Sequence, residues 1–266
     1  MNCPGSLSLD VTSLFLRFLF RLQSNGAAGR SSFQRLAHAA DLEMTDEECS
    51  QMNAILERRV EFAHSSRTIA VQDYGTGVTS SPESGRSVRS IHAGSAIPHR
   101  WGVFLYRIAR ALAPRNVLEL GTNLGISGAY LRSALDKNGG KGLLVTIEGD
   151  PSLAAIADET IRSLSHGETV VLTGRFQDQL PAALDRLGSV DMVFLDGHHE
   201  YEATLGYFEM IRPHLTPNAC VVFDDVYLWS RPVRRAWKQL VFRNPSAIAI
   251  DLAKLGILLF QNGEDA

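Results

Sequence analysis

The chain has 266 residues, of which 45% are hydrophobic and 21% are charged, and its formal net charge at pH 7 is -3. This composition is ordinary for a soluble globular chain, and the length is sufficient for one α/β domain with an N-terminal elaboration. The small negative net charge gives no electrostatic reason to expect nucleic acid as a partner.

The cysteines and the N-terminal region indicate a compartment. Cys3, Cys49 and Cys220 lie far apart and form no C-x-x-C pair, which favours a reducing compartment without a disulfide framework or a zinc site. The apolar run at residues 14–22 is too short to span a membrane, and arginines interrupt it. It also lacks the basic start of a secretory signal. We therefore expect a cytoplasmic protein without a membrane span.

Residues 1–71 are expected to form an N-terminal helical extension. Apolar side chains at helical spacing indicate helices near 9–23, 33–40 and 45–64. We interpret the first as an amphipathic helix that packs on the rest of the domain or on a partner subunit. The second alternative would give a homodimer through the N-terminal helices.

Residues 72–99 are rich in glycine and serine and show no clear periodicity. A segment of this length without periodicity in a compact protein is either a disordered linker or a functional lid. Its position immediately before the half of the chain that contains the candidate site favours the lid. The following stretch, Trp101–Leu112, is predicted to be a helix that leads into the first strand.

The remaining domain, residues 100–266, alternates between predicted strands and helices. Such alternation implies parallel βαβ units with helices on both faces of the sheet. The link between the last two strands is too short for a crossover helix, so these strands should form an antiparallel hairpin. The expected fold is thus α/β and Rossmann-like, with a mostly parallel seven-stranded sheet and a C-terminal antiparallel hairpin. The expected strands are 116–120, 143–148, 168–172, 191–195, 219–224, 246–251 and 256–260, and the expected helices are 124–136, 151–165, 178–187, 201–212 and 231–242.

The turn after the first strand contains the most informative motif. The sequence NVLELGTNLGISGAYL places Gly121 and Gly125 where the backbone can turn sharply and a ligand can approach closely. Asn123 stands where a dinucleotide fingerprint would need glycine, and the chain has no phosphate-binding P-loop motif. Glu119 is charged, and a carboxylate in a buried strand is costly unless something hydrogen-bonds to it. The pattern E-x-G-x-x-x-G resembles the first motif of the class I S-adenosylmethionine (SAM)-dependent methyltransferases, whose sheet has the topology expected above.

The next two strands supply candidates for the rest of such a cofactor site. Glu148, at the end of the second strand, could accept hydrogen bonds from both ribose hydroxyls. Asp150 has a simpler explanation as a helix N-cap, because proline follows it at the first helical turn. In the resembling family the loop after the third strand borders the adenine, so Phe176 could pack on the base and Gln177 could hydrogen-bond to its edge. A glycine-centred loop with a capped helix explains these residues equally well.

The fourth and fifth strands end in carboxylates. Asp196 follows the fourth strand and is itself followed by His198 and His199, while Asp224 and Asp225 end the fifth. Like charges crowded at one edge of a sheet repel each other, so a proton or a cation must offset them. Oxygen ligands of this kind suit Mg²⁺ or a similar divalent ion, and a protonated histidine is the alternative.

The D-G-x-H-x-Y segment that begins at Asp196 is similar to the metal-dependent O-methyltransferases of the catechol O-methyltransferase type. It resembles still more the bacterial group that contains cephalosporin-hydroxylase-like and rhamnosyl O-methyltransferase-like proteins. The resemblance covers roughly residues 90–262. It implies that Asp196, Asp224 and Asp225 hold the metal, with Asp225 in place of an asparagine. It also implies that His199 is the catalytic base in place of a lysine, acting beside Asp196.

The resemblance further implies the cofactor contacts and the activity. Glu119 is expected to face the amino acid end of SAM, through its ammonium or a bridging water. The implied activity is metal-assisted O-methylation of a small-molecule hydroxyl. The aromatics of the segment Tyr227, Leu228 and Trp229 would suit a ring or sugar acceptor, and packing explains them equally well. The expected cofactor-binding residues are Glu119, Gly121, Thr122, Asn123, Gly125, Ser127, Glu148, Gly149, Gly174, Phe176, Gln177 and Asp196.

Three alternatives to this activity remain open. An NAD-dependent oxidoreductase would use the same sheet, but the glycine pattern argues against it. A non-catalytic SAM-binding subunit could leave the chemistry to a partner, although the carboxylate and histidine cluster argues against this. The third alternative is a SAM-binding enzyme with different chemistry at the sulfonium.

Overall fold

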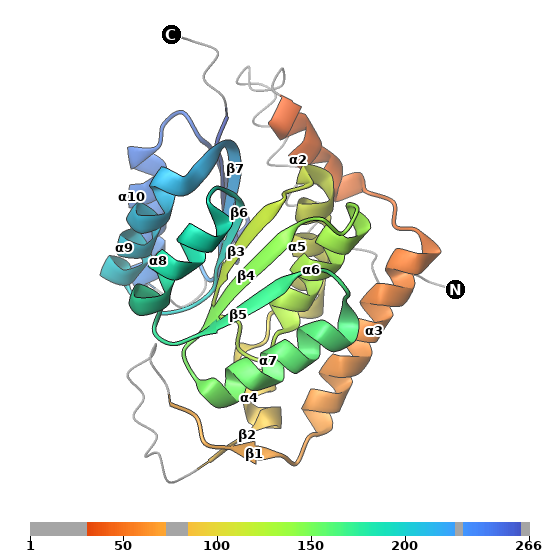
Figure 1. The fold of residues 1–266 in the computed structure, drawn as a ribbon. Helices are drawn as coiled ribbons and strands as arrows, with labels where there is room; N and C mark the ends of the chain where they lie inside the picture. The colour runs from red at the N-terminus through yellow and green to blue at the C-terminus, as the bar shows by residue number, and fades with distance from the viewer. Residues whose placement is uncertain (1–30, 73–84, 227–230, 262–266) are drawn as a thin grey trace.

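The computed structural model describes residues 31–72, 85–226 and 231–261 (Figure 1). The predicted helix at 9–23, much of the predicted lid, and the aromatic segment at 227–229 lie outside these ranges. The helices are α2 (Ser31–Asp41), α3 (Asp46–His64), α4 (Val88–Ser95), α5 (His99–Leu112), α6 (Ile126–Lys137), α7 (Pro151–Leu164), α8 (Phe176–Leu187), α9 (Tyr201–Ile211) and α10 (Arg231–Arg243), with a 3-10 turn at Arg212–His214. The strands are β1 (Thr68–Ile69), β2 (Arg86–Ser87), β3 (Asn116–Leu120), β4 (Leu143–Glu148), β5 (Thr169–Thr173), β6 (Val190–Leu195), β7 (Leu215–Phe223), β8 (Ile248–Asp251) and β9 (Gly256–Leu259).

The main sheet has seven strands in the order β5-β4-β3-β6-β7-β9-β8. Strands β3 to β7 are parallel, and β9 is antiparallel to both of its neighbours, β7 and β8. This confirms the expected α/β fold and its C-terminal hairpin. From β3 the chain proceeds to β4 and β5 on one side and later to β6 and β7 on the other. The strand order therefore reverses between β3 and β6, where open α/β sheets bind ligands at the carboxyl ends of their strands.

Helices cover both faces of the sheet (Figure 1). One core cluster joins α5, α6 and α7 to one face, and a second joins α8, α9 and α10 to the other. Strand β3 shows the alternation that places side chains on opposite faces of a sheet, because Val117 belongs to the first cluster and Leu118 to the second. By the same alternation Glu119 lies on the α6 side, close to the start of that helix.

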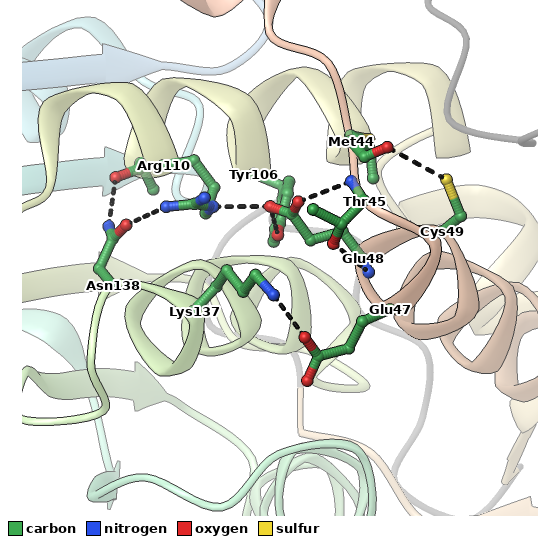
Figure 2. A network of polar contacts seen from close by, with 10 residues as sticks. Met44, Thr45, Glu47, Glu48, Cys49, Tyr106, Arg110, Lys137 and Asn138 are labelled. Atoms are coloured by element: carbon green, nitrogen blue, oxygen red, sulfur yellow. Dashed lines mark hydrogen bonds and ion pairs between the residues drawn. The ribbon is translucent and has the colours of Figure 1, made fainter.

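Glu48 fastens the N-terminal helix α3 to α5 (Figure 2). It forms a capping box with Thr45, whose hydroxyl accepts from the Glu48 amide at 3.3 Å while its own amide donates to Glu48 Oε2 at 2.9 Å. Glu48 Oε1 accepts from Tyr106 Oη at 2.6 Å and from Arg110 Nε at 2.7 Å. Burial would raise the pKa of Glu48, but these hydrogen bonds and the arginine charge outweigh it and lower the pKa to about 2. The described part of the predicted helical extension, residues 31–71, thus packs on the sheet domain.

The segment predicted to be aperiodic, 72–99, contains the helix α4. Ser87 caps this helix by accepting a hydrogen bond from the Ser90 amide at 3.2 Å, and Val88 and Ile91 are its buried residues. The helix has only eight residues, one of them Gly94, and its apolar side chains repeat over a single turn. A pattern this short is not recognisable as helical periodicity in the sequence. Residues 73–84 lie outside the described ranges.

The cysteines differ from the expectation. Cys220 is a buried free thiol in β7, whereas Cys49 in α3 is disulfide-bonded. The sequence predicted that the cysteines form no disulfide framework, and the described residues contain one bonded cysteine, Cys49. Among the described helices, none is both long and apolar enough to cross a lipid bilayer.

Candidate cofactor and acceptor site

Gly121 joins the carboxyl end of β3 to that of β6. Its φ is 100°, and a Cβ atom at this position would lie 1.7 Å from the main-chain oxygen of Asp196. The Asp196 amide in turn donates to the Leu120 carbonyl at 2.9 Å. Only glycine adopts this backbone conformation without strain and leaves room for the neighbouring carbonyl. The glycine turn and the Asp196 backbone therefore form one compact edge.

The second glycine of the motif has a different partner. Gly125 caps α6 with a φ of 81°, and a Cβ atom there would lie 2.8 Å from Ala157 Cα in α7. Its small size is thus required by the packing of α6 on α7, whereas the sequence had suggested close approach of a ligand. Asn123, between the two glycines, has a φ of 50°, and its amide donates to Glu148 Oε2 at 2.7 Å.

Glu119 is fully buried with one oxygen unused. Thr146 Oγ1 donates to Glu119 Oε2 at 2.6 Å, and among the described residues nothing hydrogen-bonds to Oε1. Burial raises the pKa of Glu119 to about 7, the Ser127 and Thr146 hydroxyls oppose this, and the nearby Glu148 adds to it. Buried acceptors without a partner are rare, so the free oxygen suits a donor that is brought by a ligand.

Glu148 lies at the end of the adjacent strand, β4, in a defined orientation. Its Oε2 accepts from the Asn123 amide, as above, and its Oε1 accepts from the Asp150 amide at 3.0 Å. Each carboxylate oxygen retains capacity for another donor. Burial raises the pKa of Glu148, and the backbone amides oppose this. Asp150 caps α7 by accepting from the Ser152 and Leu153 amides at 2.8 and 2.9 Å, which confirms its interpretation as an N-cap.

A small pocket lies between the glycine turn and the connection from α4 to α5. It brings together five of the predicted cofactor residues, which lie in the turn after β3, at the start of α6 and directly after β6. Residues 95–97 form its other wall and were predicted only as part of the lid, since their sequence carries no chemical motif. The lining is Ser95, Ala96, Ile97, Gly121, Thr122, Asn123, Leu124, Ile126, Ser127 and Asp196. Within it the Thr122 hydroxyl hydrogen-bonds to that of Thr146 at 2.5 Å, so this side chain is already partnered.

Phe176 reaches the rim of the sheet from the start of α8. A Cβ atom on Gly197, the residue after Asp196, would lie 2.8 Å from the Phe176 ring, and the ring packs edge-on against Tyr207 with centroids 5.5 Å apart. The glycine of the D-G pair therefore makes room for an aromatic ring. Gln177, the other predicted residue of this loop, is exposed. Gly149 and Gly174 lie in the turns that follow β4 and β5.

The three predicted metal ligands are accompanied by a lysine. Lys254, in the turn between β8 and β9, places its Nζ 2.9 Å from Asp224 Oδ1, 3.0 Å from Asp224 Oδ2 and 2.8 Å from Asp225 Oδ1. Burial raises the pKa of Asp196 well above its usual range, the Asp224 carboxylate adds to this and Lys254 opposes it. Burial also raises the pKa of Asp224, against the effect of Lys254. Sequence reasoning placed Lys254 only in a hairpin link and missed its role.

The two histidines point to different partners. His199 Nε2 lies 3.9 Å from Asp196 Oδ1, and about a third of its side chain is exposed. His198 has a φ of 50°, and its Nδ1 hydrogen-bonds to Tyr207 Oη at 2.7 Å. The structure thus places His199 beside Asp196, whereas His198 contacts Tyr207 and, at 3.6 Å, the Glu200 carboxylate.

Comparison with known proteins accords with this geometry. Residues 118–226 match a family of methyltransferase domains. A catechol O-methyltransferase of Niastella koreensis is 34% identical over 127 residues, which is 47% of this chain and 55% of that protein. The human transmembrane O-methyltransferase is 32% identical over 133 residues, which is 48% of this chain and 44% of that protein. The chain thus spans about half the length of the curated relatives it matches.

Solved structures of O-methyltransferases share this fold. The O-methyltransferase TomG from Streptomyces achromogenes, determined with SAM, is 29% identical with a TM-score of 0.52, covering 63% of this chain and 82% of that one. An O-methyltransferase from Bacillus cereus, determined with SAH (S-adenosylhomocysteine), shares the fold at 19% identity, with a TM-score of 0.57 and coverage of 84% and 94%. The chain has the fold of the class I SAM-dependent methyltransferases, and its glycine turn and these relatives make it similar to the O-methyltransferases of that class.

Proposed function

We propose that the protein transfers the methyl group of SAM to a hydroxyl oxygen of a small-molecule acceptor. The observation that carries this proposal is the position of Asp196. Its backbone closes the glycine turn of the cofactor site, while its side chain lies next to His199 and Asp224. One residue thus belongs both to the proposed cofactor site and to the proposed acceptor site, as transfer between two bound molecules requires.

The cofactor would lie along the carboxyl ends of β3, β4 and β5. The free Oε1 of Glu119 suits the ammonium of the amino acid end, directly or through a water, because that oxygen is buried without a partner among the described residues. Glu148 is oriented by two backbone amides and suits the ribose hydroxyls. Phe176 offers an aromatic face for the adenine. When bound, SAM would supply an electrophilic methyl group on a sulfonium.

The residues around Asp196 would prepare the acceptor. The imidazole of His199 takes the hydroxyl proton as the acceptor oxygen bonds to the methyl carbon, while the bond from that carbon to sulfur breaks and SAH is released. The chain contributes mainly positioning and exclusion of water from the reacting atoms. Asp196 Oδ1 lies 3.9 Å from His199 Nε2, so the imidazole is held on the acceptor side of the site.

The hypothesis of a divalent metal was based on Asp196, Asp224 and Asp225. In their present arrangement these side chains do not fit a metal, because the Lys254 ammonium already contacts Asp224 and Asp225. Among the described residues, no group of three or more histidine, cysteine, aspartate or glutamate side chains is arranged to hold one. We therefore derive no step through a metal ion.

Calorimetric titration of the purified chain with SAH tests the cofactor site. We expect SAH to bind and NAD not to bind. Failure to bind SAH would contradict the proposal. Incubation with SAM and a panel of catechols, other phenols and sugar hydroxyls, with SAH release as the readout, then tests transfer. Tight SAH binding with no release from any acceptor class would instead favour a non-catalytic subunit.

A further inference from the structure

We propose that Lys254 is the resident cation of the acceptor site and takes the place of a divalent metal there. This inference rests on the proposed function, because it concerns the same carboxylates. Lys254 Nζ lies within 3.0 Å of three oxygens on Asp224 and Asp225. Its side chain is only 14% exposed, and that of Asp224 is 4% exposed. The contact is therefore largely shielded from solvent, unlike a surface ion pair.

The hairpin holds Lys254 in this place through its backbone. The Lys254 carbonyl accepts from the Val226 amide at 3.0 Å, and the Lys254 amide donates to the Leu252 carbonyl at 2.9 Å. Ala253 has a φ of 70°, which turns the chain sharply just before the lysine. Leu252 and Leu255 on either side are buried and anchor the turn in the core. The lysine is thus fixed at both its backbone and its ammonium.

A divalent cation would compete with the Lys254 ammonium for the same oxygens. Mg²⁺ would need carboxylate oxygens at about 2.0–2.1 Å, and it would have to displace the ammonium to reach them. Asp225 adopts a left-handed conformation with a φ of 53°, which directs it towards the lysine. Lys254 therefore acts as a positioning residue. It holds Asp224 and Asp225, and the Asp224 carboxylate lies close enough to raise the pKa of Asp196, which is the carboxylate beside His199.

The proposal is tested on the full chain by titration with Mn²⁺ and Mg²⁺, followed by electron paramagnetic resonance and calorimetry. We expect no stoichiometric binding of either metal, and we expect SAH affinities in Mg²⁺ and in EDTA to agree within about twofold. Stoichiometric Mn²⁺ binding that is lost in Asp224→Asn would overturn the proposal. Loss of SAH binding under both conditions would instead remove the proposed function, so the two failures are distinguishable.

Variants of the lysine provide a second, independent measurement. Lys254→Met leaves the carboxylates of Asp196, Asp224 and Asp225 without their cation. We therefore expect this variant to bind Mn²⁺ and to melt at a higher temperature when Mg²⁺ is added. Lys254→Arg retains the charge and should acquire neither property, and Lys238→Met removes an exposed lysine of α10 as a matched control. If Lys254→Met remains folded and gains no affinity for metal, the assigned role of Lys254 is wrong. The wild-type titration decides the question even if this variant does not fold.

Discussion

Gly121 lies so close to the main-chain oxygen of Asp196 that a Cβ atom would approach it to 1.7 Å. The contact joins the first strand of the sheet domain to the strand that carries the proposed catalytic residues. Because the partner is backbone, neither side can move away without breaking the β3–β6 ladder, in which Leu120 pairs with Leu195.

Gly121→Ala should therefore destabilise the protein and abolish SAH binding. The left-handed backbone costs about 1–2 kcal/mol for a residue with a side chain, and overpacking adds about 1–3 kcal/mol. Gly139→Ala is a matched control, since Gly139 has a similar φ of 106° but nothing within 4 Å of the added carbon. Urea unfolding and SAH calorimetry of both variants check the prediction. If both variants lost the same unfolding free energy and the same SAH affinity, the contact with Asp196 would be shown to be unimportant.

The glycine turn also shows what the sequence can and cannot predict. Apolar runs defined the strands well, and β3 occupies the predicted residues 116–120, because a strand buried on both faces needs continuous apolar sequence. The partner of Gly125 was not predictable in this way, since Ala157 reaches it only when α7 packs on α6. Lys254 was missed for the same reason. Its contacts with Asp224 and Asp225 form only when the β8–β9 hairpin pairs with β7, and local sequence patterns do not specify that pairing.

Glu48→Gln should weaken the attachment of α3 to α5. A hydrogen bond to a charged group contributes about 1.5–3 kcal/mol, so we expect a loss of this size in the free energy of unfolding at neutral pH. The pKa of Glu48 is lowered in the folded protein to about 2 from its ordinary value of 4.5. The stabilisation is therefore complete above the unfolded value and is lost as the pH falls towards 2.

Urea unfolding of wild type and Glu48→Gln at several pH values measures this linkage. The difference between them should shrink as the pH is lowered through that window. Glu47→Gln serves as the control, because Glu47 pairs with Lys137 at a side chain that is 81% exposed and should contribute at most about 1 kcal/mol. A Glu48→Gln penalty that does not change with pH would contradict the assignment of a charged, hydrogen-bonded Glu48.

Glu119 should couple cofactor binding to proton release. Burial raises its pKa to about 7, so near neutral pH part of the unliganded protein holds a proton there. The contribution of Glu119 to stability is therefore present below its unfolded value and is lost as the pH rises through about 7. A ligand ammonium beside Oε1 favours the ionised form, which expels the proton and makes binding weaker at lower pH.

Calorimetry of SAH binding in buffers with different ionisation enthalpies measures the released protons. We expect fractional release near pH 7 in the wild type and a smaller release in Glu119→Gln, which cannot ionise. The Gln variant should also bind SAH about tenfold more weakly, the equivalent of one charge-assisted hydrogen bond. Proton release that is unchanged in Glu119→Gln would exclude Glu119 as its source.

His199→Ala should lower turnover while sparing the affinity for SAH. General base catalysis contributes about 10²–10⁴-fold to rate, and the imidazole lies beside Asp196 on the acceptor side of the site, away from Glu119 and Glu148. His198→Ala is the natural comparison, because His198 hydrogen-bonds to Tyr207 next to Phe176 and should affect SAH affinity more than turnover. Single-turnover rates at saturating SAM, together with SAH dissociation constants, separate the two effects. The opposite pattern, with turnover dependent on His198 and affinity on His199, would place the base on the other histidine and move the acceptor to the Tyr207 side of the rim.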